Sequence, residues 1–276
     1  MATTVHADAG GAIDAEAMLQ RAMEAVQQIM DSVADPAHNM VHVLAVVDHV
    51  RQALADSKDL TSHQKAVLML AALLHEVDDD KLVSTTANAN ARRITKAATD
   101  GCAEAESLTG DVISVIELVS AKKNKNSTVA PSETWKLIVR DADRLEAVGE
   151  VGIARSYAFN KRAGMPLFLP STARARTTEE VWQIATPERF AAYSGSTSMI
   201  DHYYDKLLHV CHCSSGNAYL QRLFAERQGT MIDFVLKFGQ HGDVDEAALE
   251  KLEAKYCTPS DAHGPAKRPR LEQATE

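Results

Sequence analysis

The chain has 276 residues, which is long enough to bury a substantial hydrophobic core. Hydrophobic residues make up 45% of it and charged residues 24%, as in an ordinary globular protein, and 13 glycines and 8 prolines leave few turns for a strand-rich fold. The net charge of -9 argues against extended binding to a nucleic-acid backbone, which needs a surplus of lysine and arginine. A small anion remains possible as a ligand, because a metal ion or a few local cations can hold it.

Cysteine usage and apolar segments bear on the compartment. No signal-like segment opens the chain, and the longest strongly apolar run, 66–74, is too short to span a bilayer. No disulfide framework is recognisable in the spacing of the four cysteines, Cys102, Cys211, Cys213 and Cys257. These features predict an intracellular, cytoplasmic protein that does not associate with membranes. The basic tetrapeptide Lys267–Arg270 resembles a nuclear-import signal and leaves a nuclear address open.

The first predicted elements follow a lead-in over 1–14 that is rich in glycine, alanine and threonine and is expected to be disordered. Apolar residues at helical spacing predict helices over 15–33, from about Pro36 to Leu54, and over 64–77. Asp35-Pro36 is typical of a helix start, because aspartate caps an N-terminus and proline tolerates the first turn. The third helix is apolar on all sides, so we expect it at the centre of its domain.

Later segments alternate between strong and weak periodicity. Helices are expected over 88–99, 111–121, 133–157, 198–209, 219–238 and 245–256. Between them, 159–195 accumulates Arg, Thr, Pro and Gly, which predicts an irregular excursion with one short helix near 179–184; we interpret it as a candidate lid. The predicted organisation is one helical domain over 15–240, a C-terminal helix in 241–258 and a disordered tail over 259–276.

An unusual feature is the apolar helix that ends in His75, Glu76 and the carboxylates of 78–80. Such groups near a core are costly unless they are paired or bind a cation. Imidazole and carboxylate together suit Mn, Fe, Co, Ni or Zn. The plainer alternative is a solvated turn with His75 as a hydrogen-bonded core residue.

Two further segments offer partners for this cluster. His38 and His42 are four residues apart and share one helical face, with His49 two turns further along. Asp141 and Asp143 end another apolar run, and because they are two residues apart at most one of them can face the same metal. His209-Val210-Cys211-His212-Cys213 has a metal-like composition, but no partner cluster completes a zinc site, which favours a structural role.

The order His42, His75-Glu76 and Asp143 resembles the H…HD…D signature of the HD-domain superfamily, and the chain is similar to small bacterial HD hydrolases that act on nucleotides. The resemblance implies an all-α HD-domain helical bundle with one divalent metal at its centre. It extends over most of 15–240 and rests on the segments HNMVH (38–42), AALLHEVDDDKL (71–82), RDADRLEAVGEVGIARSYAF (140–159), SMIDHYYDKLLHV (198–210) and RLFAERQGTMIDFV (222–235).

Carried over by position, the resemblance implies a set of metal ligands, namely His42, His75, Glu76 and Asp143, with Asp141 as the alternative to the last. It implies Asp79 and His38 as catalytic acid or base. Two positions depart from the pattern, because Glu76 stands where an aspartate is usual and Ala45 where relatives often have a phosphate-binding arginine. The candidate substrate-binding cations are Lys81, Arg144 and Arg155, with Lys122 or Lys123 as further compensation for Ala45.

No histidine lies between His75 and His202, where two-metal HD proteins need further ligands, so we expect one metal: Mn, Co, Ni, Fe, Mg or Zn. The resemblance implies hydrolysis of a phosphate ester or pyrophosphate linkage, preferably of a nucleotide, in which the metal polarises a phosphoryl oxygen and activates water. A non-catalytic nucleotide- or metal-binding protein is the alternative that Glu76 and Ala45 suggest. An HD-type di-iron oxygenase is a third possibility. The oligomeric state is left open.

Overall fold

The computed structural model describes residues 14–32, 38–55, 57–79, 88–119 and 132–257. All regular structure in these ranges is helical, which confirms the predicted all-α class, and none of these helices is long and apolar enough to cross a membrane. The elements are α1 (Ala15–Asp31), α2 (Met40–Ala55), α3 (Ser62–Leu74), α4 (Ala89–Ala98), α5 (Ala105–Val119), η1 (Thr134–Leu137), α6 (Ile138–Leu145), α7 (Gly149–Ala163), α8 (Thr178–Ile184), α9 (Pro187–Ala191), α10 (Met199–Asp205), η2 (Leu207–Val210), α11 (Ala218–His241) and α12 (Glu246–Tyr256).

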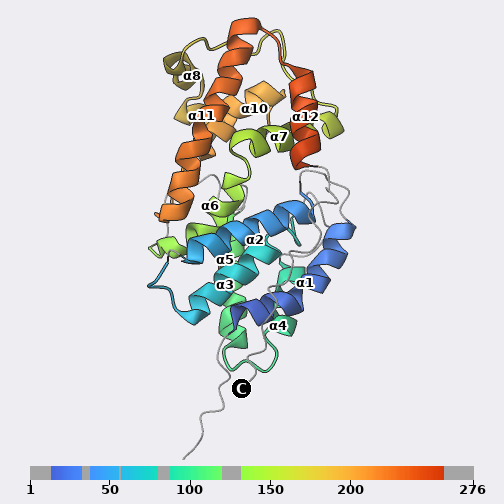
Figure 1. Cartoon of the computed structure of the whole chain (residues 1–276), viewed down its shortest axis with the longest axis vertical. Coiled ribbons are helices and arrows are strands. Elements are labelled where there is room, and N and C mark those ends of the chain that lie inside the picture. Colours follow the sequence, from blue (N-terminus) through green and yellow to red (C-terminus); the bar gives the residue numbers. More distant parts are fainter. Residues whose placement is uncertain (1–13, 33–37, 56, 80–87, 120–131, 258–276) are drawn as a thin grey trace, which may run out of the picture.

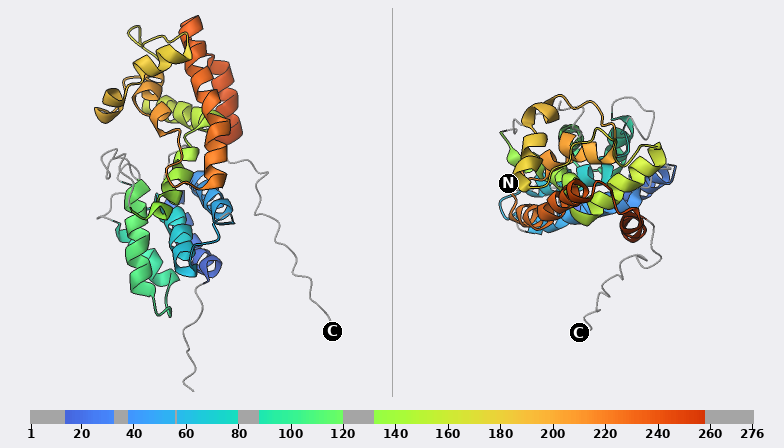
Figure 2. Two further views of the ribbon diagram at one scale, coloured as in Figure 1. Left: turned by 90° about the vertical axis from the view of Figure 1, so that its left-hand side faces the viewer. Right: turned by 90° about the horizontal axis from the view of Figure 1, so that it is seen from above.

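The helices form an elongated body in which α6 joins two groups (Figures 1 and 2). One group holds α1 to α5, and the other holds α7 to α12. The short helix α6 contacts α2, α3 and α5 on one side and α11 on the other. Because one cluster of buried apolar side chains continues through both groups, the described chain has a single main core.

The helix α3 lies at the centre of the first group, as its apolar sequence predicts. Residues 66–74 are all at most 1% exposed, and the helix contacts α1, α2, α5 and α6. Thr61 and Gln64 form a reciprocal capping box that satisfies backbone groups at its start. The helix ends at Leu74, three residues earlier than predicted, and 75–78 form a turn. His75 and Glu76 therefore project from the end of a fully buried helix.

The prediction of one helix over 133–157 is wrong. The structure divides this segment into η1, α6 and α7, and α7 continues to Ala163 inside the predicted irregular excursion. The break lies at 146–148, where successive backbone N–H groups bond three residues back, and Gly149 follows with φ of +79°. Glycine alone adopts that conformation without strain. The apolar periodicity of the sequence continues across this break because α6 and α7 each bury one face, so the pattern resembles that of a single helix.

Other elements also differ from the predictions. The helix α5 begins at Ala105, six residues before the predicted start, and α9 was not predicted at all. Thr186 caps α9 and Pro187 stands at its first position, which is a recognisable helix-start signal in so short a segment. The predicted helix start at Asp35-Pro36, the lead-in, the C-terminal tail and Lys81, Lys122, Lys123 and Lys267–Arg270 lie outside the described residues.

Candidate metal centre

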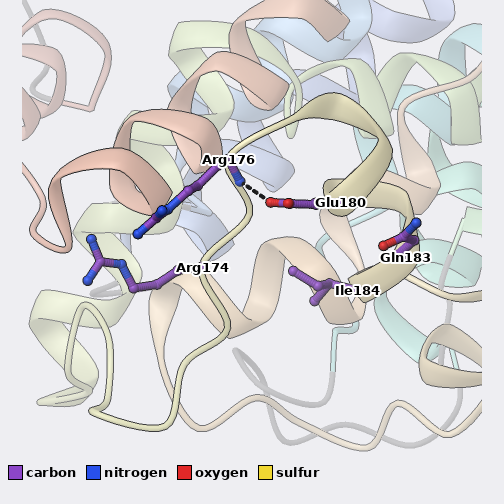
Figure 3. Close-up of a pocket in the computed structure, with 5 residues that line it drawn as sticks. All are labelled: Arg174, Arg176, Glu180, Gln183 and Ile184. Atoms are coloured by element: carbon purple, nitrogen blue, oxygen red, sulfur yellow. Dashed lines mark hydrogen bonds between the residues drawn. The ribbon is translucent and has the colours of Figure 1, made fainter.

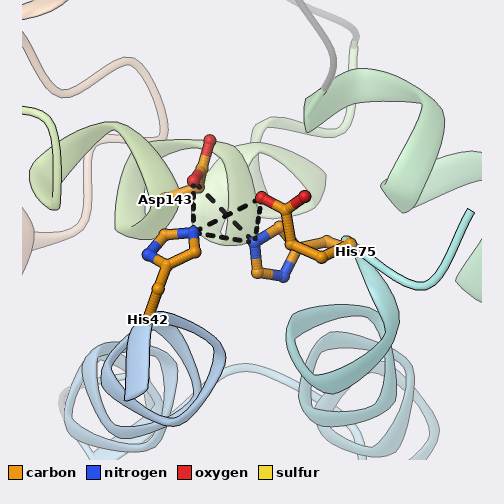
Figure 4. Close-up of side chains that lie close together, drawn as sticks. His42, His75 and Asp143 are labelled. Carbon is orange, nitrogen blue, oxygen red and sulfur yellow. Dashed lines mark hydrogen bonds and ion pairs between the residues drawn. The ribbon is translucent and has the colours of Figure 1, made fainter. Parts of the chain in front are cut away.

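Three segments far apart in the sequence bring four polar side chains together. His42 comes from the first turn of α2, which Asn39 starts by accepting a hydrogen bond from the His42 backbone N–H at 3.2 Å. His75 and Glu76 come from the turn after α3, and Asp143 comes from α6. Figure 4 shows the labelled His42, His75 and Asp143 pointing toward one another from these elements.

The four side chains each offer one ligand atom, and these atoms all lie within 4.8 Å of one another. His42 Nε2 is 3.3 Å from His75 Nε2, 3.5 Å from Glu76 Oε1 and 3.3 Å from Asp143 Oδ1. No other group of three or more possible ligands converges in this way within the described part of the chain. Glu76 Oε1 is also 3.4 Å from His75 Nε2, so the additional methylene of glutamate still places its carboxylate in the cluster.

The donor set fits a divalent cation. His75 Nδ1 donates to Ala72 O at 2.8 Å, which in the neutral ring leaves the lone pair of Nε2 directed at the centre. Two neutral imidazoles and two carboxylates provide nitrogen and oxygen donors and a charge that offsets a divalent ion. His42, His75 and Glu76 are buried, whereas the Asp143 side chain is 26% exposed. The cluster therefore has its accessible edge at Asp143.

The electrostatics of the cluster also favour a positive charge at its centre. Burial opposes protonation of His75, but the hydrogen bond and charge of Glu76 and the charge of Asp143 raise its pKa to about 9. Burial opposes ionisation of Glu76 and Asp143, yet hydrogen bonds from the neighbouring histidines hold the pKa of both carboxyl groups well below the usual range. A bound cation would take the place of the proton on His75, so binding would release it.

A second buried bridge links α2 and the end of α6 to α11. His49 Nε2 contacts Glu146 Oε1 at 3.0 Å, and His49 Nδ1 contacts Tyr219 Oη at 2.8 Å, which links α2, the end of α6 and α11. His49 is therefore engaged away from the cluster, although it shares a stripe of α2 with His42. The sequence analysis did not single out Glu146. Its signal is helical spacing: Glu146 follows Asp143 by three residues and His49 follows His42 by seven, so each lies on the same side of its segment as a member of the cluster.

This bridge predicts acid sensitivity. Burial opposes ionisation of Glu146, but the hydrogen bond and charge of His49 and the charge of Arg155 lower its pKa to about 2. The pKa of Glu146 is lower in the folded than in the unfolded protein. The bridge to His49 therefore stabilises the fold fully above about pH 4.5, and this stabilisation is lost as the pH falls toward 2. We expect Glu146→Gln to lower the free energy of unfolding at pH 7 by on the order of 3 kcal/mol. Urea unfolding in EDTA at pH 7, 5, 4 and 3 should show the difference from wild type shrinking, and a difference independent of pH would contradict it.

Asp141, the alternative ligand, is not among the clustered side chains. It is fully buried on another face of α6, and its Oδ2 accepts hydrogen bonds from the backbone N–H groups of Ser214 at 2.8 Å and Ser215 at 2.6 Å. Cys213 Sγ also donates to it at 3.3 Å. Asp141 thus anchors the turn before α11 to α6.

The two described aspartates that follow Glu76 and Val77, Asp78 and Asp79, have different surroundings. Asp78 is buried and accepts hydrogen bonds from the backbone N–H groups of Asn90 at 3.1 Å and Ala91 at 2.8 Å, so it caps the start of α4. Asp79 lies next to it in the same turn, where its N–H bonds to Glu76 O at 3.2 Å. Of these two, Asp79 remains the candidate acid or base.

The other predicted site residues lie at different distances from the cluster. The His38 ring lies edge-on to that of His42, with 6.2 Å between the centroids. Arg144 follows Asp143 on α6, where burial and the charge of Arg140 lower its pKa to about 10. Arg155 Nη1 donates to Glu146 O at 3.0 Å, so it helps to close the C-terminal end of α6.

The metal-like segment 209–213 has separate structural contacts. The His209 ring stacks on Phe190 at 4.9 Å between centroids, and Cys211 Sγ donates to Leu207 O at 3.0 Å. Together with the bond from Cys213 to Asp141, these contacts favour the structural role that the sequence suggested.

A pocket of about 420 Å³ lies in the predicted excursion and is separate from the cluster (Figure 3). Arg174 in its wall donates from Nε to Gly239 O at 3.1 Å and from Nη2 to Gln240 O at 3.4 Å, near the C-terminal end of α11. The pocket is lined by Arg174, Arg176, Glu180, Gln183 and Ile184. None of the four clustered side chains contributes to it, and the interpretation of 159–195 as a lid stays a prediction.

Comparison with known proteins places this site in a family context. The chain is 36% identical over 230 residues to the uncharacterized protein L803 of Acanthamoeba polyphaga mimivirus, which covers 77% of this chain and 93% of that protein. No protein-family model matches. An HD-superfamily hydrolase from Bacillus thuringiensis superposes with a TM-score of 0.53 at 21% identity, covering 83% of this chain and 98% of that one. The chain is thus a member of the L803 family with an HD-domain fold.

Another solved structural neighbour is Bacillus subtilis YpgQ in complex with ADP, with a TM-score of 0.50 at 20% identity, covering 82% of this chain and 97% of that one. These comparisons confirm the predicted resemblance and the helical HD-domain fold. The residues that converge in the structure are His42, His75, Glu76 and Asp143, the candidate ligands implied by the resemblance to the H…HD…D signature.

Proposed function

We propose that this HD-domain protein is a metal-dependent phosphohydrolase that cleaves a phosphate ester or pyrophosphate linkage of a nucleotide. The observation that carries the proposal is the convergence of His42, His75, Glu76 and Asp143 into one buried donor set. Support comes from a structural neighbour named as an HD-superfamily hydrolase. The nucleotide part of the proposal rests on YpgQ, which was solved with ADP.

The roles of the residues follow from their positions. A divalent ion held by the four ligands would supply Lewis-acid polarisation of a phosphoryl oxygen and a lowered pKa for a coordinated water. His75 is oriented for this by its bond to Ala72 O, and Glu76 reaches the centre from the same turn. We assign proton transfer to Asp79 or His38, which lie in the same turn as Glu76 and beside His42, respectively. Lys81, beyond the described residues, stays a predicted substrate contact.

The test is a turnover assay with the purified chain. Stripped protein is supplied with Mn, Co or Mg and offered nucleoside mono- and triphosphates, and release of phosphate and pyrophosphate is measured. We expect release only with metal and none in EDTA. Absence of release from every nucleotide, despite one bound metal per chain, would instead support the non-catalytic binding protein. Two irons per chain would support the oxygenase, although the described residues form only one ligand group.

A further inference from the structure

Two arginines occupy the face of α6 beside the metal cluster. With 3.6 residues per turn, the side chains of Arg140 and Arg144 lie on neighbouring positions of the helix, between Asp143 on one flank and Asp141 on the other. Asp143 faces the cluster and Asp141 faces the turn at Ser214 and Ser215. The arginines therefore lie between the candidate metal and this turn.

These guanidinium groups have few hydrogen-bond partners in the described part of the chain. Arg140 is 5% exposed, and its Nε has no hydrogen-bond partner in the described chain. Its nearest carboxylate oxygen is Asp141 Oδ1 at 3.8 Å, and the other oxygen of that group is already bonded to Ser214 and Ser215. Among the residues that the structure describes, none forms a hydrogen bond or ion pair with the half-buried Arg144.

A partly buried arginine next to another arginine is costly unless an anion compensates it. The charges of Asp141 and Asp143 offset this cost in part, but neither carboxylate forms a hydrogen bond or ion pair with Arg144, and Asp143 Oδ1 lies 3.3 Å from His42 in the cluster. The segment before α11 adds no further carboxylate here and brings His212 close by, next to Cys213, which donates to Asp141. Two arginines therefore lie side by side next to the acidic cluster, in a chain whose net charge is -9.

We propose that Arg144, with Arg140 beside it, forms an oxyanion subsite that holds a phosphoryl group of the substrate adjacent to the metal cluster and binds it even without metal. This inference rests on the proposed phosphohydrolase function for the identity of the anion. A guanidinium presents a planar fork of N–H donors that matches phosphate oxygens, which an ammonium group cannot reproduce.

The experiment measures binding of inorganic pyrophosphate to metal-stripped protein by calorimetry at constant ionic strength. We expect Arg144→Gln to weaken binding roughly tenfold or more and Arg144→Lys to be intermediate. The matched control is Arg176→Gln, which removes the same charge from an exposed arginine at the separate pocket and should bind like wild type. Circular dichroism and thermal unfolding establish that each variant is folded.

Failure of this inference differs from failure of the proposed function. If metal-free wild type binds no pyrophosphate, or if Arg144→Gln and Arg176→Gln bind it equally, the subsite is overturned even when the loaded protein hydrolyses nucleotides. Conversely, a selective loss in Arg144→Gln supports the subsite even when no turnover is found. A folded Arg140→Gln variant should also bind pyrophosphate more weakly than wild type.

Discussion

Replacing Asp143 with alanine is expected to abolish stoichiometric metal binding and to lower kcat/KM for the substrate by about 10³-fold, equivalent to about 4 kcal/mol of transition-state stabilisation. Asp143 Oδ1 is one of only two carboxylate donors in the cluster, and it lies at the accessible edge. Its loss leaves Glu76 alone to offset a divalent charge, so both affinity and the position of the ion should suffer. Metal content per chain and initial rates measure the two effects.

The matched control is Asp48→Asn, which removes a carboxylate on the solvent side of α2, the helix that carries His42. The Asp48 side chain is 61% exposed, so metal content and rate should stay near those of wild type. Equal metal content in Asp143→Ala and wild type, with both folded, would show that Asp143 is not a ligand.

The second large effect is expected at Asp141, and it concerns stability. We expect Asp141→Ala to lower the free energy of unfolding by about 4 kcal/mol, because it leaves the N–H groups of Ser214 and Ser215 without their acceptor and Arg140 without its nearest counter-charge. Asp141→Asn should cost less, since the amide oxygen can still accept both bonds. Urea unfolding of the metal-free proteins provides the measurement.

Metal content separates the two aspartates. Folded Asp141→Ala should still bind one ion per chain, whereas Asp143→Ala should not. A variant of Asp141 that keeps wild-type stability but loses the metal would reverse the two assignments and return Asp141 to the ligand set.

The composition and order of the candidate site could be predicted from the sequence because each part has a local signal. His75 and Glu76 end an apolar run that has to be buried, and His42 lies in a mostly apolar helix. A buried histidine or carboxylate needs a partner wherever the chain places it. The structure brings these side chains within 4.8 Å, as their shared need for partners predicts.

The helix boundaries show where local signals are insufficient. The periodicity over 133–157 predicts one helix, although the chain turns at 146–148 before Gly149. Periodicity reports which face is buried, and α6 and α7 each bury one face in the same continuous core. The presence of Gly149 alone does not show that the helix breaks there, because the sequence does not give its φ angle.

The choice between Asp141 and Asp143 illustrates the division between sequence and tertiary structure. The sequence alone determined the all-α class, the central apolar helix and a set of candidate ligands with one open position, because burial and helical spacing are local properties. The residue pattern alone did not decide which aspartate faces the cluster, since both follow the same apolar run; only the family resemblance favoured Asp143. The turn at Ser214 and Ser215 decides this by donating two backbone N–H groups to Asp141, a contact between residues more than 70 positions apart. The position of His49 opposite Glu146, rather than in the cluster, depends likewise on how α2, α6 and α11 pack.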